Sequence, residues 1–379
     1  MNKFPVEGIP PSSYFSKTVY LDPHFVIAAP EMPITAELVS AISEWGFTEL
    51  LSEGEPKASY VANDMYADSK STIGDSSTIA DHDKLQQAER FLASFQRYVQ
   101  SLFLRTAEKN NLNFDAIAEN VKTACNYVKE NHRFLMRVQH HVEPVRDEDY
   151  LASHTTRSTV IAIIIGGFIK LPSHRLIELG VASLLHEIGM IKLPQQSYLS
   201  SSPLGEHERK LIYSHPVMGY NLLKSRNFPL SISTAALEHH ERENGAGYPQ
   251  QLSGDKISLY AKIIAVACSY EAILAKRPHK EAKDGYTGML ELLKNEGKQY
   301  DDNIIRALVR SLSIYPIGLY VLLSSGKKGQ VVDVNPETPR YPIVQIFGEL
   351  MPDGKNRIME TSAEELSIIR PLTREEIEG

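Results

Sequence analysis

The sequence has little cysteine, a single tryptophan and no long apolar run. Only Cys125 and Cys268 occur among its 379 residues, which excludes a disulfide framework and predicts a reducing compartment. The first fifteen residues lack the apolar stretch that a secretory signal needs. The longest apolar run, residues 160–169, contains two glycines and is too short to span a bilayer. These absences predict a cytoplasmic protein without a membrane span.

The sequence also lacks an excess of basic residues. Forty Lys and Arg residues stand against 47 Asp and Glu residues, which gives a net charge of −7. That balance argues against binding to long nucleic acids, but it permits a small anionic ligand held by a few cations. The hydrophobic content of 42% and the charged content of 23% are typical of a globular protein. The length suffices for two or three domains.

The periodicity along the chain predicts a mainly α fold with two small β-containing parts. Residues 1–80 are expected to form a small α+β module. Residues 84–142 show apolar residues at three- and four-residue spacing, which predicts a helical linker that joins modules, passes a signal or dimerises. Residues 147–315 are expected to form helix after helix, punctuated by proline and glycine. Residues 316–350 predict a short β appendage, and residues 351–379 a charged tail.

The central helical region is rich in side chains that bind metal ions. They are His154, His186, Glu187, His215, His239, His240 and Cys268. Each neutral imidazole offers one nitrogen to a divalent ion, and the Glu187 carboxylate can span two ions. The set is larger than one structural zinc requires. It predicts a two-metal hydrolytic site, in which paired ions activate a water and clamp a phosphodiester.

The most specific part of this set is 239-HHERENGAGYP-249, where two adjacent histidines lead into a Gly-Tyr-Pro turn. Adjacent side chains on a helix point about 100° apart, so His239 and His240 can reach different ions, or one ion and a substrate. Taken alone, His154 or His215 is more often a hydrogen-bonded core residue than a ligand. The whole set favours a metal site.

Residues 147–312 resemble the HD-GYP domain, a branch of the HD superfamily of metal-dependent phosphohydrolases. The resemblance runs in order through YLASHTTRS, LLHEIGMIKLP, SHPVMGY, EHHERENGAGYP, IIAVACSYEAI and KRPHK. It implies an HD-type helical bundle, and the β appendage is similar to the usual C-terminal extension of these proteins. In that family two divalent ions, iron or manganese and alternatively zinc, support hydrolysis of cyclic di-GMP to pGpG or GMP.

The resemblance also implies a role for individual positions. His186 and Glu187 match the catalytic pair. The implied metal ligands are His154, His186, Glu187, His215, His239, His240 and Cys268. The implied substrate contacts are Gly247, Tyr248, Pro249, Arg277 and Lys280.

Several positions depart from the family pattern. Glu187 stands where the family has a bridging Asp, and its extra methylene moves the carboxylate by about one carbon–carbon bond length. Cys268 stands where the family has a terminal Asp ligand, so it is either a softer ligand or a buried core cysteine. Met190 replaces a lysine, for which Lys192 is a candidate substitute. Tyr150 stands where a third metal would need an acidic ligand, so at most two metals are expected.

Three functions follow from these observations. The first is a cyclic di-GMP phosphodiesterase in second-messenger signalling. The second is a catalytically degenerate receptor that binds cyclic di-GMP and signals through the N-terminal module. The third is an interaction scaffold whose histidines hold a structural metal or none. A related cyclic dinucleotide as ligand, a homodimer and a signalling protein partner are further expectations.

Overall fold

The computed structural model describes residues 1–9, 13–15, 17–22, 25–28, 33–34, 36–44, 47–57, 78–109, 112–138, 150–194, 205–275, 283–295, 298–335, 337–351, 356–373 and 375–378. The chain divides into a first unit, residues 1–76 with 361–367, and a second unit, residues 77–360 with 368–379. Each unit is described by itself.

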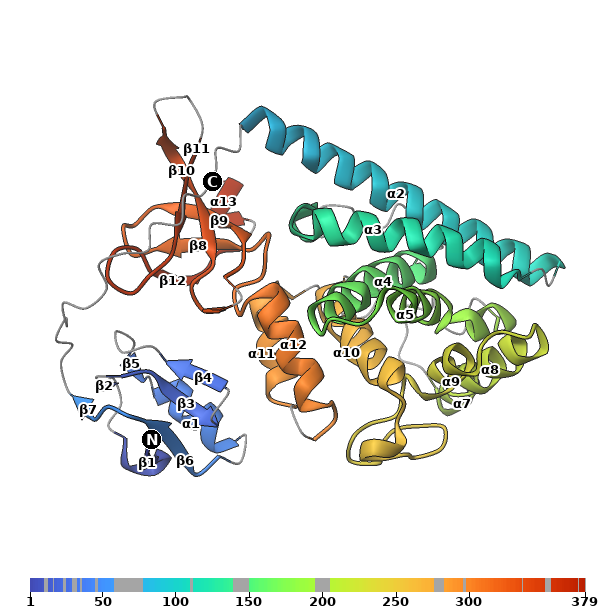
Figure 1. Ribbon diagram of the computed structural model, residues 1–379, viewed down its shortest axis with the longest axis horizontal. Coiled ribbons are helices and arrows are strands. Elements are labelled where there is room, and N and C mark those ends of the chain that lie inside the picture. The colour runs from blue at the N-terminus through green and yellow to red at the C-terminus, as the bar shows by residue number, and fades with distance from the viewer. Residues whose placement is uncertain are drawn as a thin grey trace. The chain divides into compact units, whose positions relative to one another are not determined.

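The first unit is built on antiparallel strands (Figure 1). The larger sheet contains, in spatial order, β1 (Asn2–Pro5), β6 (Glu49–Ser52), β3 (Val19–Asp22) and β4 (Phe25–Ala28). The remaining elements are the turn η1 (Val6–Gly8), the helix α1 (Ala36–Glu44) and a smaller sheet of β5 (Pro33–Ile34), β2 (Ser13–Phe15) and β7 (Pro56–Lys57). Phe15, Ile34 and Ile42 lie in one buried core, which confirms the predicted α+β module.

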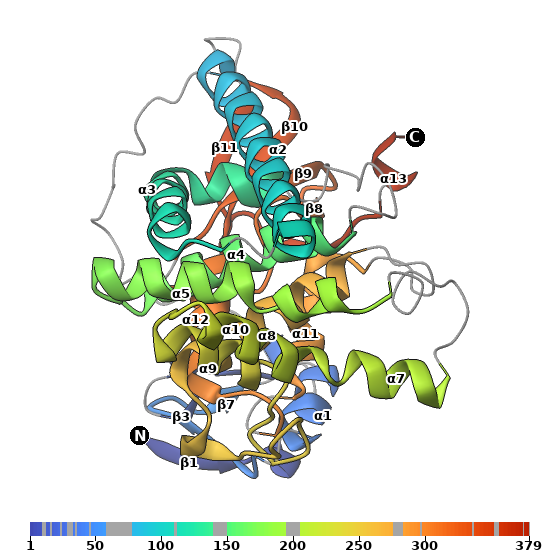
Figure 2. The ribbon, with the colours of Figure 1, turned by 90° about the vertical axis from the view of Figure 1, so that its right-hand side faces the viewer.

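Two long helices begin the second unit. They are α2 (Thr78–Lys109) and α3 (Phe114–Val138), which fall largely within the predicted helical linker of residues 84–142. Their apolar residues recur every three or four positions, and Phe91 of α2 stacks on Tyr127 of α3 with ring centroids 4.1 Å apart. Figures 1 and 2 show the two helices side by side across α4 and α5. The predicted linker therefore packs on the helical bundle instead of standing apart from it.

The centre of the bundle consists of helices that are buried on nearly every side. α4 (Tyr150–Phe168) packs against both α5 (Ser173–Leu185) and α10 (Leu259–Leu274). All residues from 158 to 166 of α4 are buried, as are residues 263–268 of α10. A helix without a polar face is stable only when other elements cover it, which explains the central place of α4 and α10.

Shorter helices surround this centre. They are α7 (Glu206–Ile212), α8 (His215–Ser225), α9 (Leu230–Glu238), α11 (Gly285–Leu293) and α12 (Asp302–Leu312), with the turns η3 (Ile188–Lys192) and η4 (Gly254–Lys256). Two begin at aspartate caps: the Asp284 carboxylate accepts a bond from the Thr287 amide, and Asp301 does the same for Ile304. The predicted mainly α fold is confirmed.

A five-stranded antiparallel sheet closes the second unit. Its spatial order is β11 (Asn356–Glu360), β10 (Ile343–Leu350), β9 (Lys328–Asp333), β8 (Tyr320–Leu323) and β12 (Ile368–Pro371), and α13 (Glu375–Glu378) follows. The tail predicted after residue 351 is therefore corrected, because it supplies both edge strands. Neither edge strand has a buried side chain, so an alternating apolar signal is missing from this part of the sequence.

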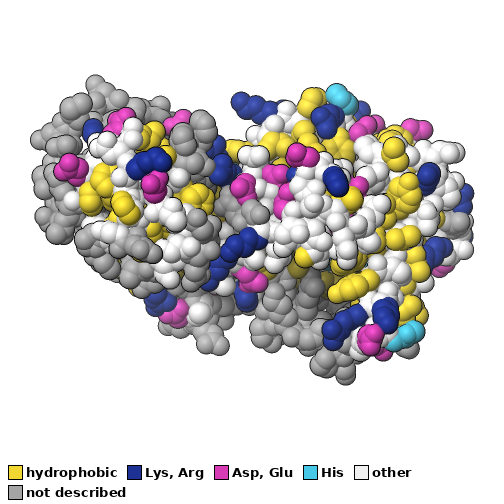
Figure 3. All heavy atoms as spheres, turned by 90° about the horizontal axis from the view of Figure 1, so that it is seen from below, with side chains coloured by type: hydrophobic (Ala, Val, Ile, Leu, Met, Phe, Trp, Pro, Cys, Tyr) yellow, Lys and Arg dark blue, Asp and Glu magenta, His cyan; other side chains and the backbone are white. Residues whose placement is uncertain are grey.

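The surface agrees with the modest net charge. On the face drawn in Figure 3, cationic and anionic side chains of the described residues intermingle, and no broad basic field covers that face. None of the described helices has the length and hydropathy to cross a membrane.

Candidate metal centre

Histidines from distant parts of the chain meet inside the second unit, together with one carboxylate. Most of them lie where a helix begins or ends. His154 lies in α4, His186 and Glu187 follow α5, His215 begins α8, and His239 and His240 follow α9. At the end of a helix a side chain has a neighbouring helical turn on one side only, so it can point inward with less crowding than in the middle of the helix.

A close backbone approach brings two of these ends together. A Cβ atom on Gly189, in η3, would lie 2.0 Å from the carbonyl oxygen of His215 and 2.7 Å from the backbone nitrogen of Gly219. Only glycine permits this contact. The turn that carries His186 and Glu187 therefore reaches the first turn of α8, and His215 comes to face Glu187.

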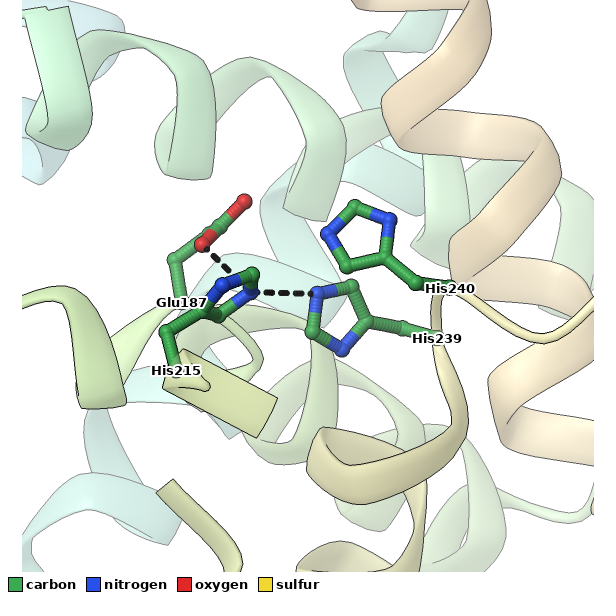
Figure 4. A group of neighbouring side chains, drawn as sticks. All are labelled: Glu187, His215, His239 and His240. Atoms are coloured by element: carbon green, nitrogen blue, oxygen red, sulfur yellow. Dashed lines mark hydrogen bonds and ion pairs between the residues drawn. The ribbon is translucent and has the colours of Figure 1, made fainter. Parts of the chain in front are cut away.

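The potential ligands form two clusters that share one carboxylate. The first cluster is His154, His186 and Glu187, and the second is Glu187, His215, His239 and His240 (Figure 4). Within each cluster, the potential ligand atoms lie within 4.8 Å of one another.

Glu187 lies between the clusters. Its Oε2 is 3.2 Å from His215 Nε2, while its Oε1 is 3.9 Å from His186 Nε2 and 4.0 Å from His154 Nε2. One oxygen thus faces each cluster, as a bridging carboxylate requires.

Backbone carbonyls fix the orientation of three imidazoles. His186, His215 and His239 each place Nδ1 at 2.5, 2.5 and 2.9 Å, respectively, from the carbonyl three residues earlier. A carbonyl oxygen can only accept a hydrogen bond, so each Nδ1 carries the proton and each Nε2 presents a lone pair. Metal-binding histidines are commonly held in this way.

The separation of two nitrogens tests whether an ion fits. His215 Nε2 and His239 Nε2 are 3.1 Å apart, although both present lone pairs. Two lone pairs at that distance repel each other unless a cation or a proton lies between them. Adjacent ligands of one ion with bonds of about 2.1 Å are separated by about 3 Å, so the spacing suits metal coordination. The buried His186 Nε2 also has no hydrogen-bond partner within the described residues. The residues present fit a divalent metal.

The protonation states suit the same chemistry. Burial lowers the pKa of His186 to about 4, and burial followed by neighbouring histidines holds the pKa of His239 and His240 well below the usual value. Burial by itself would raise the pKa of Glu187, but the surrounding histidines, His215 first, bring it to about 2. The imidazoles of His186, His239 and His240 are therefore neutral and the Glu187 carboxylate is ionised near neutral pH, which are the forms that bind metal.

The Gly-Tyr-Pro turn lies directly against the second cluster. The Tyr248 ring stacks on His240, with centroids 4.6 Å apart and 19° between the planes. A Cβ atom on Gly247 would lie 2.4 Å from Glu241 Cα and 2.5 Å from His240 O, so this position requires glycine. The peptide bond between Tyr248 and Pro249 is cis.

Comparisons with known proteins agree with this geometry. The family model for the HD domain matches residues 145–304. A cyclic di-GMP phosphodiesterase of Borreliella burgdorferi is 26% identical over 201 residues, which cover 53% of this chain and 53% of that protein. One of Pseudomonas aeruginosa is 31% identical over 201 residues, covering 53% and 48%. A cyclic di-GMP phosphodiesterase response regulator of Xanthomonas campestris pv. campestris is 38% identical over 138 residues, covering 36% of each.

The chain carries an HD domain of the HD-GYP type. The resemblance to the HD-GYP domain that the sequence predicts is thereby confirmed. The chain spans about half the length of the first two of these relatives.

The HD-GYP domain brings together most of the residues singled out from the sequence, but not all. Cys268 belongs to neither cluster; it is 6% exposed, and its thiol lies 3.6 Å from the Ala265 carbonyl oxygen. Its role as a ligand stays a prediction. Arg277 and Lys280 fall outside the described residues. Met190 is buried, and Tyr150 stacks on His154 with ring centroids 5.9 Å apart.

Two buried carboxylates that the sequence did not predict support the HD-GYP site. Glu271 of α10 is 2% exposed, and its Oε2 accepts the Nδ1 proton of His154. Glu241 is equally buried; its Oε1 and Oε2 accept hydrogen bonds from the amides of Gln250 and Leu252 at 2.6 and 2.9 Å. The glutamates lie among the motif residues, but nothing in their spacing distinguishes them from surface acids. Glu271 positions a potential ligand, and Glu241 positions the signature loop.

Proposed function

We propose that this chain is a metal-dependent phosphodiesterase that hydrolyses cyclic di-GMP to pGpG or GMP. Two divalent ions, iron or manganese and alternatively zinc, are held by the two clusters. The observation that carries the proposal is the shared carboxylate: Glu187 has one oxygen facing each set of histidine nitrogens. The curated relatives that are cyclic di-GMP phosphodiesterases support the same substrate class.

The residues of the chain have separate tasks in the proposed reaction. The paired metals, when bound, lower the pKa of a water and neutralise charge on the phosphodiester. The histidines of both clusters would hold the metals, and Glu187, which lies between the clusters, would contribute its carboxylate to both. Glu271 keeps the proton of His154 on Nδ1. The turn of Gly247 and Tyr248 covers His240 and borders the space that the substrate enters.

Elemental analysis followed by a product assay tests the proposal. Protein purified without oxygen is analysed for bound metals and incubated with cyclic di-GMP, and the products are separated by chromatography. About two metals per chain and the appearance of pGpG or GMP are expected. Intact cyclic di-GMP beside a fully metallated protein would contradict the enzymatic function.

A pair of histidine variants supplies the control. His186→Ala removes a buried member of the first cluster and should abolish both metal retention in that cluster and turnover. His174→Ala removes an exposed histidine of α5 and should change neither. If the two variants behave alike, the clusters are not the reaction centre.

A receptor for cyclic di-GMP is the second candidate. Met190 favours it, because a buried apolar side chain stands where the family resemblance implies a cation near the phosphate. Metal and cyclic di-GMP would then bind without turnover. Calorimetric binding combined with an absence of products would distinguish the receptor from the enzyme. Signalling through the N-terminal module, a homodimer, a protein partner and a cytoplasmic location stay predictions.

A further inference from the structure

An exposed tyrosine extends the signature loop toward solvent. Tyr213 lies between α7 and α8, two residues before His215, and is 51% exposed. Its ring stacks on Tyr248 with centroids 4.3 Å apart and 24° between the planes. Tyr248 stacks in turn on His240. The three rings form an aromatic ladder that leads from the second cluster to the surface.

The ladder holds the outer ring in a fixed plane. Within the described residues, Tyr248 is the only aromatic side chain in ring contact with Tyr213. The exposure of the side chain therefore leaves ring surface open to solvent. The Glu241 carboxylate accepts hydrogen bonds from two amides of the loop that carries Tyr248. These bonds hold in place the ring on which Tyr213 stacks. A flat apolar surface that is ordered before binding takes a flat ligand with little further loss of conformational freedom.

A nucleobase is the flat ligand that this position suits. In a cyclic dinucleotide each base is joined to the phosphodiester through one ribose. A phosphodiester at the two clusters therefore carries bases outward to the rim of the site, where Tyr213 lies. Bases of every kind stack on aromatic side chains, because stacking does not depend on a hydrogen-bonding pattern. Val217, four residues further along the chain, is also apolar and exposed.

We propose that Tyr213 is a substrate-binding residue whose open ring surface stacks on one purine base of the cyclic dinucleotide. This inference rests on the proposed function, since it assumes that the phosphodiester is held at the metal clusters. The ring supplies affinity without choosing between guanine and adenine. Discrimination between purines must then come from other contacts.

Substitution of the ring tests the proposal. Tyr213→Ala should raise the KM and the Kd for cyclic di-GMP by about 5- to 150-fold, the range that loss of one base–aromatic stack produces. Tyr213→Phe keeps the ring and should stay close to the unaltered protein. The same factor is expected with cyclic di-AMP, because stacking tolerates either purine. Tyr220→Ala, which removes a tyrosine of α8 that contacts Lys224, is the matched control and should have no effect.

Inhibition by inorganic phosphate separates base stacking from a structural role. Phosphate has no base, so its inhibition constant should be the same in Tyr213→Ala as in the unaltered protein. If Tyr213 only supported the loop, Tyr213→Ala would weaken phosphate inhibition and lower kcat as well, and that result overturns the proposal. Equal affinity of Tyr213→Ala and the unaltered protein for cyclic di-GMP overturns it too.

The outcomes also separate this inference from the proposed function. Binding of cyclic di-GMP that depends on Tyr213, without turnover, refutes the phosphodiesterase and supports the base contact. Turnover with a KM that is the same in Tyr213→Ala and the unaltered protein supports the phosphodiesterase and refutes the base contact. A metallated protein that neither binds nor cleaves any cyclic dinucleotide refutes both.

Discussion

Removal of the Glu271 carboxylate should weaken one metal site and largely spare the other. Glu271 is buried, contacts Nδ1 of His154, and lies near Arg157, with 3.9 Å between Oε1 and the guanidinium nitrogen Nη1. Glu271→Ala takes away the acceptor that holds the His154 proton on Nδ1. His154 is then free to rotate or to protonate Nε2, the nitrogen that faces Glu187.

The magnitude follows from the role of such outer contacts. Loss of the group that orients a ligand histidine lowers metal affinity by about 10- to 100-fold, which corresponds to about 1.4–2.7 kcal/mol. The first cluster has only three members, so the loss falls on a third of its ligands. His215, His239 and His240 are oriented without Glu271, and the second cluster should keep its affinity.

A titration with manganese or zinc against a chromophoric chelator measures this effect. The unaltered protein should show two binding steps, and Glu271→Ala should shift one of them. Glu271→Gln keeps an oxygen acceptor and should shift it less. Glu291→Ala, which removes an exposed acid paired with Lys283, should shift neither. Thermal melting of the metal-free variants checks the fold. Unchanged steps in a folded Glu271→Ala variant, or an equal shift of both steps, would refute the assigned role.

Three further predictions concern the same site. Glu187→Ala should reduce the bound metal below two ions by elemental analysis, because no carboxylate then joins the two clusters; full occupancy would mean that Glu187 does not bridge. Gly247→Ala should cost about 1–3 kcal/mol in urea unfolding and lower turnover, since its Cβ would meet the Glu241 backbone at 2.4 Å; unaltered stability would contradict the close contact. The metal-free protein should lose stability as the pH falls from about 6.5 toward 4, by up to about 1.4 kcal/mol per pH unit for each buried histidine. Over this range the histidines of the unfolded chain become protonated. In the folded chain His186, with its pKa of about 4, and His239 and His240 stay neutral. Urea unfolding across that pH range measures the loss, and a flat profile would contradict neutral imidazoles.

The sequence contained the signals for most of the fold and for the ligand set. The heptad-like spacing in α2 and α3 and the apolar runs of α4 and α10 predict helices that the structure contains, since burial imposes that periodicity. Six of the seven expected ligands lie in the two clusters. Their histidines were detectable because paired imidazoles are rare beside a glycine-proline turn.

The features that escaped prediction depend on contacts between distant segments. Glu271 and His154 are separated by more than a hundred positions in the sequence, and only the packing of α10 on α4 joins them. The edge strands β11 and β12 lack buried side chains, so no alternation marks them. The stack of Tyr213 on Tyr248 likewise exists only because α7 ends beside the signature loop.

The wide spacing of the ligands along the chain has a consequence for how the protein acquires its metals. An unfolded chain offers only the neighbouring pairs His186–Glu187 and His239–His240, and every other ligand requires closure of a long loop. Complete coordination therefore follows the packing of α5 on α4, of α9 on α5 and of α8 on α9. Metal that binds the finished bundle stabilises it by mass action, in proportion to the concentration of free ion. When metal is scarce, the protein should accordingly remain folded but inactive, and it should take up its ions again without refolding.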